Sequence, residues 1–291
     1  MEPVRELVRS RTVGAGTEQY LLTLHREDFS ALYPGMIRYV LAVMSGDIPL
    51  ALFRTNTYEY SPLNPRTAET VAVQAADDWE KELRTDPFRL FRNYPPDLPE
   101  HRPASFAADL IVIQGSPRED GNCGILATWA TQAARDAGRT TQVIYPHDLD
   151  IHCCIGCYQC YNTGSCVFND DMTEIINAIR SASLIIACSP VYTNTVTGML
   201  KLVIDRTQAY HAERALHGGR TGQKGLIFSV AGRKGEDNFT CITRVVSAFF
   251  RNLGIQPAGQ VLIDHVDTIR DIRTIAGLEQ EVKEKVHSSL Q

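Results

Sequence analysis

The sequence has few of the features that mark membrane, secreted or nucleic-acid-binding proteins. No apolar run approaches the roughly 18 residues of a membrane span, and the first residues lack the apolar stretch of a secretory signal. No run of Lys and Arg stands out and the net charge is −5, which disfavours nucleic acid or a membrane surface as a partner. We therefore expect a cytoplasmic protein, in which cysteines stay thiols and a disulfide staple is unexpected.

Two common phosphate-binding motifs are also missing. The stretch IQGSPREDGNCG follows an apolar run, but only Gly115 fits the G-x-G-x-x-G dinucleotide pattern, and no G-K-[ST] follows. Ser116, Arg118 and Asn122 still offer hydrogen-bond donors beside an expected helix start. This combination favours a mononucleotide phosphate, and a plain strand-to-helix turn is the alternative.

Apolar runs and helical patterns alternate regularly after residue 103. The expected strands are 110–115, 140–146, 183–191, 223–232 and 258–264, and the expected helices are 122–138, 170–182, 197–207, 237–254 and about 268–287. Five such alternations predict an α/β fold with a doubly wound, five-stranded parallel sheet over residues 104–291. Segment 210–220 is expected to be a surface loop.

The first 103 residues contain no motif. Segments 17–32 and 66–84 look like amphipathic helices, and 48–60 is strand-like. Four prolines within 93–103 predict an extended linker. We therefore expect residues 1–103 to form a mainly helical N-terminal extension that ends in a Pro-rich linker.

Two more loops follow expected strands. Segment 189–198, SPVYTNTVTG, brings Tyr192 and Asn194 to the end of the third strand, where they can meet a flat ring, and 229–238 is glycine-rich and polar. Each loop alone is also compatible with an ordinary connection. Because the carboxyl ends of parallel strands share one edge, these two loops and the loop at 115–122 should converge there on a ligand.

Five of the eight cysteines lie within residues 152–166. Cys154, Cys157, Cys160 and Cys166 have the spacing C-x2-C-x2-C-x5-C, and two-residue gaps let successive thiolates converge on one iron–sulfur cluster. Zinc sites more often have two C-x2-C pairs that lie farther apart. A cluster, a zinc site and unligated thiols all stay open, and Cys153 falls outside the spacing.

Three motifs in this order resemble those of the iron–sulfur flavoproteins within the NADPH-dependent FMN reductase group of flavodoxin-like proteins. They are GSPREDGN, CIGCYQCYNTGSCVFNDDM and SPVYTNTVTGMLKLVIDRT, and the resemblance covers about residues 108–265. It implies FMN, with its phosphate on Ser116, Arg118 and Asn122 and its isoalloxazine near Pro190, Val191, Tyr192, Thr193 and Asn194. It also implies a [4Fe–4S] cluster on Cys154, Cys157, Cys160 and Cys166, in a cysteine-rich loop (153–166) inserted in a flavodoxin-like domain. Cys123 stands where the family usually has Ser or Thr.

The function expected from this resemblance is that of an FMN-dependent iron–sulfur oxidoreductase. FMN would exchange a hydride with a small organic substrate or NAD(P)H, the cluster would relay single electrons to a ferredoxin-type partner, and Tyr192 is the candidate proton donor. A homo-oligomer, dimer or tetramer, is implied by the family. The alternatives are a cluster-free NAD(P)H-dependent FMN or quinone reductase and a non-enzymatic electron carrier.

Overall fold

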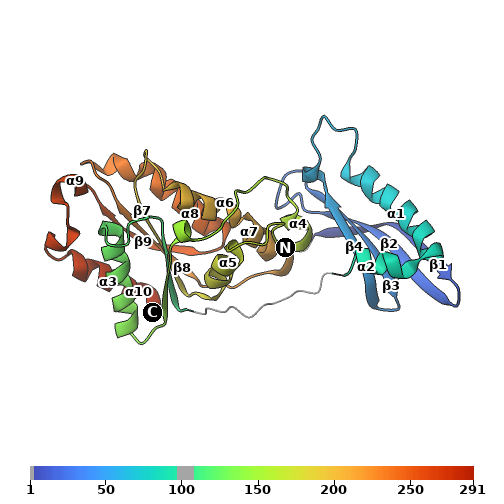
Figure 1. Cartoon of the computed structure of the whole chain (residues 1–291), viewed down its shortest axis with the longest axis horizontal. Coiled ribbons are helices and arrows are strands. Elements are labelled where there is room, and N and C mark those ends of the chain that lie inside the picture. Colours follow the sequence, from blue (N-terminus) through green and yellow to red (C-terminus); the bar gives the residue numbers. More distant parts are fainter. Residues whose placement is uncertain (1–2, 97–107) are drawn as a thin grey trace. The chain divides into compact units, whose positions relative to one another are not determined.

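The chain forms two compact units in a computed structural model that describes residues 3–96 and 108–291 (Figure 1). The N-terminal unit holds the elements before residue 97 together with Ile155–Val167 and Ala215–His217. The other described residues form the flavodoxin-like unit. Most of the Pro-rich linker predicted over 93–103 lies outside the described residues. Within those residues, no helix has the length and apolar character that crossing a membrane requires.

The flavodoxin-like unit is built on one parallel sheet. Its strands are β5 (Leu110–Gln114), β6 (Thr141–Ile144), β7 (Leu184–Pro190), β8 (Lys224–Val230) and β9 (Gln256–Ile263). They lie in the order β6-β5-β7-β8-β9, and every pair is parallel. This is the flavodoxin-like order, so the predicted five-stranded, doubly wound sheet is confirmed.

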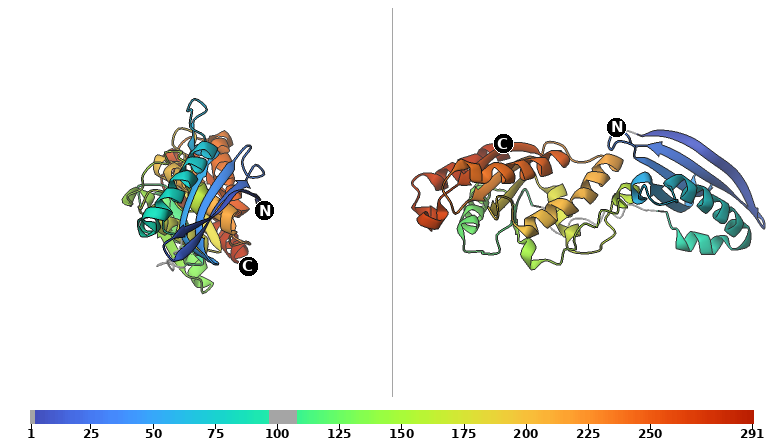
Figure 2. Two further views of the ribbon diagram at one scale, coloured as in Figure 1. Left: turned by 90° about the vertical axis from the view of Figure 1, so that its right-hand side faces the viewer. Right: turned by 90° about the horizontal axis from the view of Figure 1, so that it is seen from above.

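Helices cover both faces of this sheet (Figures 1 and 2). Side chains of a strand alternate between faces, so Leu110 and Val112 pack with α3 (Asn122–Asp136) and α10 (Leu278–Leu290). Ile111 and Ile113 belong to the core on the other face. That face is covered by α5 (Met172–Ser181), α6 (Gly198–Arg206), α7 (Gln208–His217) and α8 (Thr240–Asn252). The short helices of this unit are η2 (Pro146–Asp148), η3 (Glu236–Phe239), α9 (Val266–Ile269) and η4 (Ile272–Thr274).

Two predictions for this unit are wrong. Segment 210–220 is not a surface loop, because α7 extends to His217 and buries Tyr210 and Ala212 in the core. The last long helix begins at Leu278 and not near residue 268. Arg270 has a left-handed φ of 64°, which an α-helix cannot accommodate. The chain therefore forms α9 and η4 first, and this segment reaches the site described below.

The N-terminal unit is a four-stranded antiparallel sheet with helices on one face (Figure 2). The strands are β1 (Val4–Ala15), β2 (Glu18–Asp28), β3 (Ile37–Ser45) and β4 (Ile48–Asn56), in that order. They are followed by η1 (Thr57–Glu59), α1 (Ala68–Thr85) and α2 (Pro87–Asn93). Trp79 and Leu83 of α1 and Leu90 of α2 are buried against the sheet.

The helix predicted over residues 17–32 is wrong, because this segment contains strand β2. Tyr20, Leu22 and Leu24 alternate along the strand and are buried under the helices, while Leu21 between them is exposed. The period is therefore 2 and not 3.6. The helix predicted over 66–84 and the strand near 48–60 are confirmed. The N-terminal segment is consequently a mixed α/β unit and not mainly helical.

Candidate functional site

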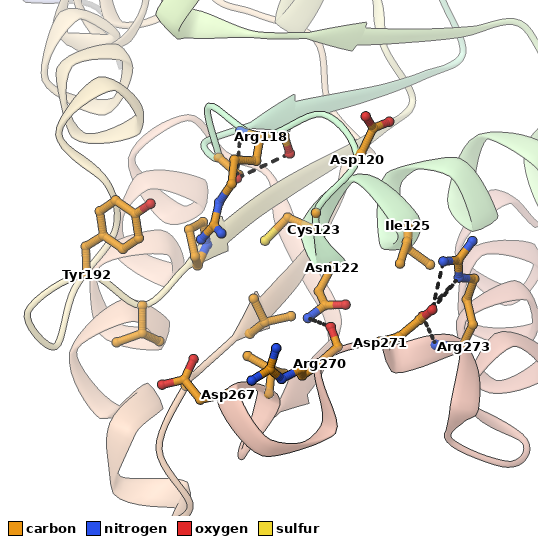
Figure 3. A pocket seen from close by; sticks show the side chains of 17 residues that line it. Arg118, Asp120, Asn122, Cys123, Ile125, Tyr192, Asp267, Arg270, Asp271 and Arg273 are labelled. Atoms are coloured by element: carbon orange, nitrogen blue, oxygen red, sulfur yellow. Dashed lines mark hydrogen bonds and ion pairs between the residues drawn. The ribbon is translucent and has the colours of Figure 1, made fainter.

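A cavity of about 550 Å³ lies in the flavodoxin-like unit, where the parallel strands end (Figure 3). Its walls come from the loops after β5, β7 and β8, so the predicted convergence of three loops is confirmed. A fourth wall comes from the segment after β9. The lining residues are Ser116, Arg118, Asp120, Gly121, Asn122, Cys123, Ile125, Pro190, Val191, Tyr192, Val230, Gly232, Val266, Asp267, Arg270, Asp271 and Arg273.

One end of the cavity is suited to an anion. Helix α3 begins at Asn122 without a side-chain cap, so its first N–H groups have no intrahelical partner and its dipole attracts negative charge. Ser116 is only 4% exposed, and its hydroxyl accepts a hydrogen bond from the Arg118 N–H at 3.2 Å. The loop folds back closely enough that a Cβ on Gly124 would collide with the Glu119 carbonyl.

The side chain of Asn122, which is predicted to bind the phosphate, is hydrogen-bonded to backbone groups of the protein. Its side-chain amide donates to the carbonyl of Arg270 at 3.1 Å and its carbonyl accepts from the N–H of Ile272 at 3.2 Å. Asn122 therefore lines the cavity and also ties the start of α3 to the fourth wall.

The other end of the cavity is formed by the loop after β7. Pro190, Val191 and Tyr192 line it, and the Val191 N–H donates to the Val230 carbonyl at 2.8 Å. Tyr192 is 44% exposed and its ring reaches the cavity rim (Figure 3). Thr193 and Asn194 have left-handed φ values of 46° and 64° and are not among the lining residues. Six of the eight predicted flavin-binding residues thus line the cavity.

Close backbone packing holds the first two loops side by side. The Gly115 N–H donates to the Cys188 carbonyl at 2.7 Å, and the Thr197 hydroxyl donates to the Gly115 carbonyl at 2.7 Å. A Cβ on Gly115 would lie 2.9 Å from that hydroxyl, so only glycine fits without a shift. The thiol of Cys188 donates to the carbonyl of Cys123 at 3.5 Å. Its hydrogen bonding with Cys123, followed by burial, raises the pKa of Cys188 well above its usual value.

The fourth wall, residues 266–273, is not predicted from the sequence, whose pattern favours a long helix from about residue 268. It contributes Asp267, Arg270, Asp271 and Arg273. Arg273 is paired with Asp271 at 2.7 Å. The alternation of Asp and Arg directly after the last strand, at the ligand edge of the sheet, is the signal that could have revealed it.

The predicted cysteine ligands are divided between segments of the chain. Cys154 belongs to the flavodoxin-like unit, whereas Cys157, Cys160 and Cys166 belong to Ile155–Val167 of the N-terminal unit. The eight cysteines all lie in described residues and form no disulfide. Four thiols at this spacing have the chemistry that an iron–sulfur cluster needs. Across residues 3–96 and 108–291, however, no three Cys, His, Asp or Glu side chains are gathered to hold a metal ion.

The parallel sheet and the cavity at its ligand edge define a flavodoxin-like fold with a candidate ligand site at the carboxyl ends of its strands. A family model described as NADPH-dependent FMN reductase matches residues 108–268, more than half of the chain. The chain therefore belongs to the NADPH-dependent FMN reductase family, and the resemblance of its three motifs is confirmed.

Several curated relatives are named iron–sulfur flavoproteins. One from Methanocaldococcus jannaschii is 38% identical over 99 residues, which cover 34% of this chain and 51% of the relative. One from Archaeoglobus fulgidus is 31% identical over 149 residues, covering 51% of this chain and 65% of the relative. The chain thus spans between half and two thirds of the length of these relatives. A solved apo NADH:FMN oxidoreductase is 16% identical, with a TM-score of 0.46 over 62% of this chain and 87% of that one.

Proposed function

We propose that the protein is an FMN-dependent oxidoreductase that exchanges a hydride with a small organic substrate or NAD(P)H. The observation that carries this proposal is the cavity of about 550 Å³, which has an uncapped helix start at one end and Pro190, Val191 and Tyr192 at the other. The first end suits a phosphate and the second a flat ring. Most of the lining residues also lie within the segment that matches the family, residues 108–268.

The residues of the chain have separate tasks in this proposal. Ser116, Arg118 and the first N–H groups of α3 bind the phosphate. Pro190 and Val191 support the ring, and Tyr192 holds a proton on its hydroxyl for the substrate. Thr193 and Asn194 complete the turn that presents Tyr192. Bound FMN supplies the hydride chemistry, and the protein supplies binding and orientation.

We also propose that Cys154, Cys157, Cys160 and Cys166 bind a [4Fe–4S] cluster. The support is their spacing and the naming of several relatives as iron–sulfur flavoproteins. A cluster exchanges single electrons, so the protein would pair two-electron chemistry with a ferredoxin-type carrier. We expect the protein to act in the cytoplasm as a homodimer or homotetramer.

Purification without oxygen tests both proposals. We expect about one FMN per chain by absorbance after acid extraction, and about four irons and four sulfides per chain. Cys157→Ser should remove the iron and leave the flavin, whereas Cys241→Ser in α8 should change neither. A yellow protein that takes up no iron would support the cluster-free NAD(P)H-dependent FMN or quinone reductase. A colourless protein that retains neither group when both are supplied would overturn the function.

A further inference from the structure

Ile155–Val167, the cysteine-bearing segment, is held by polar side chains of the N-terminal unit. Asn56, at the end of β4, is fully buried and donates both to the Tyr158 carbonyl at 3.2 Å and to the Asn162 side-chain oxygen at 2.9 Å. Asn162 in turn is only 2% exposed and donates to Glu59 at 2.6 Å. Gln159 donates to the other oxygen of Glu59.

The same segment is fixed by an arginine and by aromatic rings. Arg38 of β3 pairs with Glu27 at 2.6 Å and donates to the Tyr161 carbonyl at 3.0 Å. Tyr161 is 1% exposed, and its ring lies edge-on to that of Tyr33 with centroids 5.2 Å apart. Between Cys157 and Cys166, these contacts hold the carbonyls of Tyr158 and Tyr161 and the side chains of residues 159, 161 and 162.

We propose that the N-terminal unit positions the cysteine thiols, with Asn56 and Glu59 as the positioning residues. Burying the amides of Asn56 and Asn162 is favourable only when their hydrogen bonds are made. The half-buried carboxylate of Glu59 accepts two of the hydrogen bonds that join the two segments. The network therefore restricts the conformations of Cys157 and Cys160, which lie in the stretch that it grips. This gives residues before 97 a role in presenting the thiols to the metal that we propose for them.

The test measures thiol reactivity in the full-length, metal-free protein. Alkylation by iodoacetamide is followed by mass spectrometry at Cys157 and Cys160, with the exposed Cys241 as internal reference. In Glu59→Ala, alkylation of Cys157 and Cys160 should be about tenfold faster relative to Cys241. Ile155–Val167 can then open locally without breaking the charge-assisted hydrogen bonds that Glu59 accepts. Glu59→Gln should restore most of the slow rate, because its amide keeps one acceptor oxygen and Gln159 can present its own oxygen to the new NH₂.

The matched control is Glu80→Ala, which removes a glutamate of α1 that pairs with Arg84 on the surface of the same unit. It should leave all rates unchanged. Unchanged rates in Glu59→Ala, or an equal rise at Cys241, would overturn the proposal. Since the assay contains no metal, its result is independent of whether iron binds. If the wild-type thiols are alkylated slowly but the protein never takes up iron, the positioning proposal stands and only the proposed cluster is overturned.

A second, independent inference concerns the fourth wall of the cavity. Arg118 and Arg270 enter the cavity from opposite walls (Figure 3). Within residues 3–96 and 108–291, neither guanidinium has an ion-pair or hydrogen-bond partner, whereas Arg273 is held by Asp271. The backbone of Arg270 is fixed by its N–H, which donates to the Val266 carbonyl at 2.8 Å, and by the amide of Asn122 at the start of α3. Arg270 lies beyond the end of the family match at residue 268.

We infer that Arg270 is a second cationic ligand of the FMN phosphate, an inference that rests on the proposed binding of FMN. A phosphate at the start of α3 would lie next to Asn122, whose side-chain amide donates to the carbonyl of Arg270. The carboxylates of Asp120 and Asp267 also line the cavity, and their negative charge would repel a phosphate dianion. The positive charges of Arg118 and Arg270 are therefore needed for the cavity to accept one. The strained φ of Arg270 is consistent with a functional demand on this position.

Titration of the flavin-free full-length protein with FMN and with riboflavin, which lacks the phosphate, tests this inference. Arg270→Ala should weaken FMN binding by about tenfold to hundredfold and leave riboflavin binding unchanged. Arg270→Lys should retain part of the FMN affinity, and the control Arg273→Ala should retain all of it within about twofold. An FMN affinity unchanged in Arg270→Ala, or an equal loss for both flavins, would overturn the inference. Wild-type protein that binds neither flavin would instead overturn the proposed function.

Discussion

Arg206 and Asp170 form a buried, two-bonded ion pair in the flavodoxin-like unit. The guanidinium donates to the two carboxylate oxygens at 2.6 and 2.9 Å, and both side chains are 1% exposed. Arg206 also donates to the His152 carbonyl at 2.6 Å, and the N–H of His152 donates to Asp170 at 2.9 Å. The pair therefore anchors the backbone just before Cys153 and Cys154.

This ion pair should make stability depend on pH. Burial acts to raise the pKa of Asp170, but hydrogen bonds from Arg206 and from the His152 N–H outweigh it and lower the pKa from 3.8 to about 2. A carboxyl with a lowered folded-state pKa contributes stability above its unfolded pKa and loses it on acidification. About 2 kcal/mol should therefore disappear between roughly pH 4 and pH 2, as measured by urea unfolding.

Asp170→Asn should remove that pH dependence and destabilise the protein at pH 7. Removing one partner leaves the guanidinium of Arg206 buried without its counter-charge, which costs about 3–5 kcal/mol. The exposed pair of Lys201 and Asp205 on α6 provides the control, since Asp205→Asn should cost less than about 1 kcal/mol. Equal effects of the two substitutions would contradict a special role for the buried pair.

Gly124→Ala should impair flavin binding although alanine is the better helix former. Helix propensity alone predicts a gain of about 1 kcal/mol, but the new Cβ would collide with the Glu119 carbonyl and displace the loop before α3. We expect FMN affinity to fall by tenfold or more, as measured by quenching of flavin fluorescence, because overpacking costs about 1–3 kcal/mol. Gly198→Ala, with nothing within 4 Å of its Cβ, should bind FMN normally.

Tyr192→Phe should separate catalysis from flavin binding. The substitution keeps the ring at the cavity rim and removes the hydroxyl proposed as proton donor. Positioned proton donors contribute about 10²–10⁴-fold to rates, so kcat with a quinone acceptor should fall at least tenfold. FMN affinity and reduction of the flavin by NAD(P)H should stay normal in stopped-flow measurements. A wild-type kcat would assign the proton to solvent or to another group.

Leu83→Ala should loosen the N-terminal unit selectively. Leu83 is fully buried between α1 and the antiparallel sheet, and deleting such a side chain costs about 2–5 kcal/mol. Because the two units have separate cores, hydrogen exchange should accelerate in β3 and stay unchanged in β7. Leu63→Ala, at a residue 94% exposed, should alter neither. Faster exchange in both strands would show that the units unfold together.

The candidate site could be predicted in part. The loops after β5, β7 and β8 can be recognised in the sequence because each follows an apolar run that predicts a buried strand. The carboxyl ends of parallel strands share one edge of the sheet, so these loops come together there. The contacts of Asn122 and the wall that carries Arg270 could not be predicted. They join residues about 150 positions apart in the chain, and no local pattern encodes such a pairing.

By itself, the sequence determined the parallel sheet, the loop that begins at Gly115 and the spacing of the cysteines. These features depend on residues that are neighbours in the chain, and their periodicity is visible there. Tertiary structure alone decided that residues 18–28 form a strand, since Leu21 and Leu22 satisfy either period until the helices bury one of them. It also decided that Ile155–Val167 packs with the N-terminal unit. The burial of Asn56 and Asn162 together required hydrogen-bond partners from distant segments, and only the folded chain supplies them.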